Sequence, residues 1–128
     1  MLDYYWFIFL ITTNSAIILF LAINVSRLRI KHRISWGDGN NKDLMKAIRV
    51  HANGIEQLPI YGLLILALIF SGTSNSVLAY LSIAFTFSRL THAYGMLYRK
   101  PILRQVGAAI TYLLQGIAIV WLLMSVNA

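Results

Sequence analysis

Long uncharged apolar stretches alternate with short basic segments along the whole chain. Residues 4–23 contain no charged side chain, and about 20 residues of helix are needed to cross a hydrocarbon core of roughly 30 Å. A second uncharged run, 57–88, is interrupted by the polar turn-forming segment 71–76, which predicts two helices joined by a tight turn. A last uncharged run begins at residue 106 and extends to the C-terminus. The pattern predicts four membrane-spanning helices, over residues 3–30, 43–71, 76–99 and 101–126.

The two central helices must include polar residues to reach across a bilayer. The apolar run before the turn and the one after it are each too short to span alone. The second helix must therefore reach back through Glu56 and Asn53, and the third must continue through Arg89 and His92. Polar side chains are thus expected within the membrane or at its edge.

Composition excludes several classes of protein. The chain of 128 residues is 59% apolar and 12% charged, whereas soluble domains are about 45–50% apolar and about 25% charged. Disordered chains have low hydrophobicity, and disulfide scaffolds need cysteines, of which there are none. The composition therefore predicts an all-α integral membrane protein.

The charge balance predicts an orientation. The chain has 11 Lys and Arg against 4 Asp and Glu. Seven of the basic residues lie from Arg27 to Arg49, three more are Arg99, Lys100 and Arg104, and Arg89 lies toward the same end of the third predicted helix. The positive-inside rule then places both basic connections in the cytoplasm and both termini on the non-cytoplasmic side. We therefore expect an up-down four-helix bundle. Nucleic-acid binding is not expected, because short basic loops between spans commonly serve orientation alone.

A polar stripe follows one face of the second helix. Arg49, Asn53 and Glu56 are spaced i, i+4 and i+7, which places them within about 40° of one another. An ionisable group inside a membrane segment costs about 2.5–3.5 kcal/mol, so it is expected to face the bundle interior and to mark function. An ion pair between Arg49 and Glu56 at the membrane interface is the simpler alternative.

The other helices add cations at the same end. Arg89 and His92 are spaced i, i+3 on the third helix, Arg104 lies in the first turn of the fourth, and Arg27 lies near the end of the first. A helix N-terminus favours an anion. A metal site is not expected, because the chain has no cysteine and no zinc-binding motif of histidines.

Three motifs carry a resemblance to a known family: Arg49-x-x-x-Asn53-x-x-Glu56-x-x-Pro59, Arg89-x-x-His92, and Arg104 at the start of the fourth helix. Together they resemble the membrane-associated proteins in eicosanoid and glutathione metabolism (MAPEG), and the chain is similar to short bacterial members. The resemblance implies a homotrimer in the bacterial inner membrane, with glutathione bound between subunits near the cytoplasmic face.

The resemblance also implies roles for individual residues. The residues implied to bind glutathione are Arg27, Arg49, Asn53, Glu56, Arg89 and His92. Within this set Glu56 would take the γ-glutamyl ammonium, and Arg27 would come from the neighbouring subunit. The implied catalytic residue is Arg104, which would face the sulfur. A thiol with a pKa of about 8.5 is mostly protonated at pH 7, so a nearby guanidinium would raise the thiolate fraction.

The acceptor substrate is less defined than the cofactor. Eicosanoid synthases of the family usually carry a Ser beside the last Arg or a Tyr one turn on, whereas Arg104 is followed by Gln105 and then by Gly107-Ala108-Ala109. We therefore expect a glutathione transferase or peroxidase acting on lipophilic electrophiles or lipid hydroperoxides from the membrane lipid. Two alternatives stay open, a non-catalytic protein that binds glutathione or lipid and a small-molecule transporter. Small four-span exporters place an essential Glu in their first helix, where this chain has none.

Overall fold

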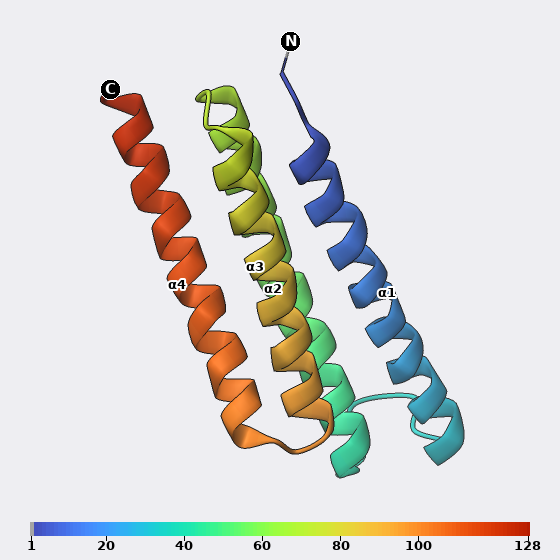
Figure 1. The fold of residues 1–128 in the computed structure, drawn as a ribbon. Coiled ribbons are helices and arrows are strands. Elements are labelled where there is room, and N and C mark those ends of the chain that lie inside the picture. Colours follow the sequence, from blue (N-terminus) through green and yellow to red (C-terminus); the bar gives the residue numbers. More distant parts are fainter. Residues whose placement is uncertain (1) are drawn as a thin grey trace.

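The computed structural model describes residues 2–128, and no strand occurs among them. Its helices are α1 (Tyr5–His32), α2 (Lys42–Phe70), α3 (Asn75–Leu97) and α4 (Pro101–Val126). Successive helices run in opposite directions, so both termini lie at one end together with the α2–α3 turn (Figure 1). The basic α1–α2 and α3–α4 connections lie together at the other end.

Three helices qualify as membrane spans by length and composition within the described residues. These helices are α1, α2 and α4. The remaining helix, α3, has 23 residues and would extend about 35 Å, which is long enough to cross a bilayer, but it carries several polar side chains. Because α3 packs against all three other helices, those polar side chains can face protein instead of lipid.

The bundle is built around a central pair of helices. The helices α2 and α3 pack on each other and on both outer helices, while α1 and α4 do not contact each other within residues 2–128 (Figure 1). Each outer helix buries only a narrow stripe: Leu10, Asn14, Leu21 and Leu28 on α1, and Gly107, Thr111, Leu114 and Ala118 on α4. The outer faces of α1 and α4 are therefore largely exposed in a single chain.

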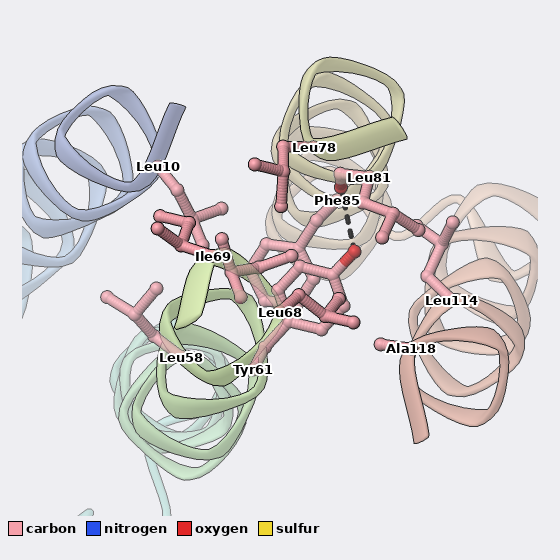
Figure 2. Packing of buried hydrophobic residues seen from close by; sticks show 11 residues of the cluster. Leu10, Leu58, Tyr61, Leu68, Ile69, Leu78, Leu81, Phe85, Leu114 and Ala118 are labelled. Atoms are coloured by element: carbon pink, nitrogen blue, oxygen red, sulfur yellow. Dashed lines mark hydrogen bonds between the residues drawn. The ribbon is translucent and has the colours of Figure 1, made fainter. Parts of the chain in front are cut away.

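The apolar core lies nearer the end that carries the termini. Figure 2 shows Tyr61 stacked on Phe85, with ring centroids 4.0 Å apart and an interplanar angle of 10°. The Tyr61 hydroxyl donates to the carbonyl oxygen of Leu81 at 2.8 Å, as a buried phenol requires. Residues of all four helices close the cluster around this pair, among them Leu10 from α1 and Leu114 from α4 (Figure 2).

Two glycines allow α3 and α4 to approach closely at the basic end. A Cβ atom on Gly107 would lie 2.7 Å from the Cα atom of His92, and a Cβ atom on Gly95 would collide with the backbone of Arg104. Only a residue without a side chain fits at these positions. The close contact fixes the heights of His92 and Arg104 relative to each other.

Candidate functional site

Three of the residues singled out in the sequence meet in the interior. The Arg89 guanidinium donates through Nη2 to Oδ1 of Asn53 and lies 3.4 Å from Nδ1 of His92. Arg89 is 7% exposed and His92 is 5% exposed, whereas Asn53 is half-buried. The structure therefore joins the motifs of α2 and α3 directly.

A hydroxyl from α4 completes this cluster. Nη1 of Arg89 donates to Oγ1 of Thr111 at 3.3 Å, and Ser88 lies 3.0 Å from the same hydroxyl. The Thr111 hydroxyl in turn donates to the carbonyl oxygen of Gly107 at 2.8 Å. Among residues 2–128 no carboxylate pairs with Arg89. Its charge is held by neutral acceptors from three helices, so Arg89 fixes α2, α3 and α4 at one height.

Glu56 lies outside this buried cluster, on an open groove between α2 and α4. It is the central residue of the 29-residue helix α2 and is exposed. Gln57, Tyr112 and Gln115 line the same groove, which has a volume of about 360 Å³. An exposed carboxylate at this depth of a membrane bundle requires a polar partner.

Arg49 occupies the same helix face as Glu56, nearer the basic end, and is exposed. Within the described residues the structure contains no ion pair between Arg49 and Glu56. The structure therefore does not support the simpler alternative, in which Arg49 and Glu56 form an ion pair within one chain.

Arg104 lies in the first turn of α4 and is exposed. It lines a groove of about 350 Å³ together with Lys46, Met96 and Arg99. The N-terminal residues of α4 receive no side-chain cap, so their free N–H groups and the helix dipole favour an anion there. This groove is strongly cationic.

Arg27 lies apart from the other candidates in a single chain. It is exposed on α1, where Nη2 donates to Oδ1 of Asn24 at 2.9 Å. It lines a separate groove of about 420 Å³ with Lys31 and Lys46. Among the grooves of the described chain, none is lined by Arg27 together with Glu56 or Arg104.

The distance along α4 from Arg104 to the level of Thr111 matches the length of a short peptide. From Arg104 to Thr111 the helix rises by about 10 Å, and three residues of extended chain also span about 10 Å. A tripeptide lying along α4 could thus contact Arg104 at one end and the Asn53–Thr111 level at the other.

One buried polar pair was missed by the sequence analysis. Nδ2 of Asn14 donates to Oγ1 of Thr86 at 3.0 Å, which links α1 to α3. Asn14 and Arg89 both line a small cavity of about 10 Å³ between α1, α2 and α3, large enough for about one water molecule. The available signal was an Asn inside the otherwise apolar first run.

These features define an integral membrane protein. It is an antiparallel four-helix bundle in which Arg89 is buried among polar side chains, and its cationic grooves lie toward one end. The family model for the MAPEG family matches residues 7–124. The Inner membrane protein YecN of Escherichia coli K12 is 33% identical over 111 residues, covering 84% of this chain and 85% of the relative. YecN of Escherichia coli O6:H1 matches with the same values. The chain belongs to the MAPEG family.

Proposed function

We propose that this protein is a membrane glutathione transferase that transfers glutathione to lipophilic electrophiles. The observation that carries the proposal is the set of exposed, unpaired charges around α2 and α4, with one carboxylate, Glu56, and the guanidinium groups of Arg49 and Arg104. A zwitterionic ligand with an ammonium, two carboxylates and an ionisable thiol complements this set.

The proposed binding mode assigns one function to each group. Glu56 accepts hydrogen bonds from the γ-glutamyl ammonium. Arg49 binds a carboxylate of the ligand, and an Arg–carboxylate pair is strongest when it is bidentate. Asn53 binds the peptide backbone. Arg89 and His92 lie beneath Asn53, and the hydrogen bond from Arg89 orients its amide. We therefore revise the role of Arg89 from direct ligand to positioning residue.

Arg104 stabilises the thiolate in this proposal. Each unit by which the thiol pKa falls corresponds to about 1.36 kcal/mol of thiolate stabilisation. A guanidinium is a fixed positive charge, and the uncapped start of α4 adds N–H groups of the same polarity. The lipophilic substrate would reach the sulfur from the bilayer along the exposed face of α4.

The proposed active unit is a homotrimer in the inner membrane, with the site toward the cytoplasm. The relatives are named as inner membrane proteins, and the basic end of the bundle is the end that the positive-inside rule assigns to the cytoplasm. The open groove at Glu56 needs cover at membrane depth, and a helix of a neighbouring copy would provide it, with Arg27 of that copy nearer the basic end. Chemical cross-linking in native membranes tests this assembly.

Conjugation of glutathione to an aromatic halide in detergent, with a thermal shift on adding glutathione, tests the function. We expect Glu56→Gln to raise the KM for glutathione about tenfold or more, because a hydrogen bond to a charged group contributes about 1.5–3 kcal/mol. Arg104→Ala should mainly lower kcat and raise the pKa of the bound thiol. Arg33→Ala, which removes an exposed arginine at the same end, is the matched control and should change neither. A folded trimer that shows neither binding nor turnover contradicts the proposal.

Two other functions predict different results in the same system. A non-catalytic member would bind glutathione without turning over a broad panel of electrophiles. A proton-coupled transporter is favoured only by the central position of Glu56 in α2, and it predicts uptake into sealed vesicles that Glu56→Gln abolishes. Family membership and the cationic groove at Arg104 favour the transferase.

A further inference from the structure

The α1–α2 connection presents the most exposed tryptophan of the described chain. The segment 33–41, named here the Trp36 loop, joins the basic ends of α1 and α2 (Figure 1). Trp36 is 90% exposed, compared with 43% for Trp121 on α4. A large aromatic side chain left almost fully in solvent needs a partner surface.

The Trp36 loop is held in a defined conformation. Nη1 of Arg29 donates to the carbonyl oxygens of Ile34 at 3.3 Å and Gly37 at 2.8 Å. The carboxylate of Asp38 accepts from the backbone N–H of Asn40 at 2.9 Å. The exposure of Trp36 is therefore a property of an ordered loop and does not result from an unstructured one.

The start of the Trp36 loop packs back against the last turns of α1 and the first turns of α2. Ile34 packs on the cluster of Leu28, Leu44 and Ala47, and Leu28 lies only about 8 Å along the helix beyond Ile23, the end of the uncharged run. The headgroup layer of a bilayer is about 5–8 Å thick on each side. Ile34 therefore holds the Trp36 loop close to the headgroup layer, where tryptophan is enriched in membrane proteins.

The charged residues around Trp36 favour anionic lipids. Lys31, Arg33 and Lys42 are exposed beside the loop, and none of them forms an ion pair within residues 2–128. The single acid of the loop, Asp38, is partly buried and hydrogen-bonded to the loop backbone. Each basic residue near an anionic membrane surface favours binding about fivefold.

We propose that the Trp36 loop is a binding surface for anionic phospholipid headgroups, with Trp36 inserted among them and Lys31, Arg33 and Lys42 contacting their phosphates. The surface is separate from the grooves at Glu56 and Arg104, and of its three basic residues only Lys31 lines the groove at Arg27. The proposal therefore does not depend on the proposed transferase activity. A second copy of the chain is the competing occupant of this surface.

Tryptophan quenching by brominated lipids tests the proposal on the full-length chain. In Trp6→Phe/Trp121→Phe, Trp36 is the only tryptophan, and Trp6→Phe/Trp36→Phe leaves Trp121 as a matched control at the opposite, neutral end. Both proteins are placed in phosphatidylcholine nanodiscs that contain equal fractions of brominated phosphatidylglycerol or brominated phosphatidylcholine.

Brominated phosphatidylglycerol should associate with Trp36 at least fivefold more strongly than brominated phosphatidylcholine, and with Trp121 equally. The preference should fall in 0.5 M salt, because exposed charges are then screened over a few ångströms. Replacing both Arg33 and Lys42 with Gln should reduce it several-fold while Trp36 stays quenchable, which also shows that Trp36 remains at the membrane. Equal quenching by the two lipids overturns the proposal. A blue-shifted Trp36 that neither lipid quenches also overturns it, and indicates cover by a second copy.

Discussion

At the scale of single residues, the main feature is a buried arginine whose partners are all neutral. Arg89 is held by Asn53, Thr111 and His92, so its charge costs desolvation without the Coulomb gain of a carboxylate. Such a group is stable only while its hydrogen bonds are intact, because a buried unsatisfied donor costs about 1–3 kcal/mol and more when charged. The cluster therefore makes the spacing of three helices depend on a few side chains.

Thr111→Val is expected to lower the free energy of unfolding by about 1–3 kcal/mol. The substitution keeps the shape of the side chain but removes the acceptor for Nη1 of Arg89 and the partner of Ser88. Unfolding by denaturant in mixed micelles measures the change. Thr12→Val is the control, because the Thr12 hydroxyl is exposed and bonds only within α1. Equal effects from both substitutions would show that the Arg89 cluster contributes no special stability.

At the scale of elements, the contact between α3 and α4 sets the geometry of the site. Gly95 and Gly107 bring the two backbones together, and this contact determines how far Arg104 lies from His92. The outer side of α4 has no comparable constraint, since Gly116 has open space where a Cβ would lie.

Gly107→Ala is expected to destabilise the bundle by about 1–3 kcal/mol, the usual cost of overpacking, or more. The new Cβ would lie 2.7 Å from Cα of His92, so α4 must move away from α3. Gly116→Ala adds the same methyl group to the same helix without a collision, and should be neutral or stabilising by up to about 1 kcal/mol. Parallel unfolding experiments compare the two variants. Similar losses in both would contradict the close-approach argument.

The end of α1 makes a second prediction at this scale. Arg33 closes α1 in the left-handed region with φ 55°, where a side chain costs about 1 kcal/mol and glycine does not. Arg33→Gly should therefore raise the free energy of unfolding by up to about 1 kcal/mol. Arg33→Ala removes the same charge but keeps the Cβ atom, so it should give no such gain. Thermal unfolding of both proteins distinguishes backbone strain from charge.

At the scale of the whole molecule, charge and hydrophobicity are separated along the bundle axis. The basic connections lie at one end, and the opposite end carries both termini and the short α2–α3 turn (Figure 1). The positive-inside rule gives this asymmetry a direction in the membrane. The same asymmetry places the cationic grooves at Arg27 and Arg104 toward the basic end of the bundle.

Fusions to the C-terminus test this orientation. Alkaline phosphatase fused after Ala128 should be active, because it folds only outside the cytoplasm, and green fluorescent protein at the same position should stay dark. Fusions ending in the α3–α4 connection should give the opposite pair of results. Alkaline phosphatase that is active at the α3–α4 connection and inactive at the C-terminus would reverse the proposed orientation.

The helix count, the helix bounds to within two residues and the all-helical class followed from the sequence, because apolar runs of membrane length are local features that do not depend on packing. The family was also accessible, since its motifs are short spacings on single helices. Which polar residues face each other depends on helix rotation and height, which local spacing does not define. Arg49, Asn53 and Glu56 share one face, yet only Asn53 meets Arg89.

Tertiary structure decided which charges are free and which are held. It buried Arg89 against Thr111 and paired Asn14 with Thr86, and it left Glu56 and Arg104 exposed in separate grooves. The physical reason is that α1 and α4 contact only the central helices. A charged side chain is therefore buried where its helix face packs against another helix and exposed where it does not. Sequence thus determined which groups lie near the basic end, and packing determined which of them remain available to a ligand.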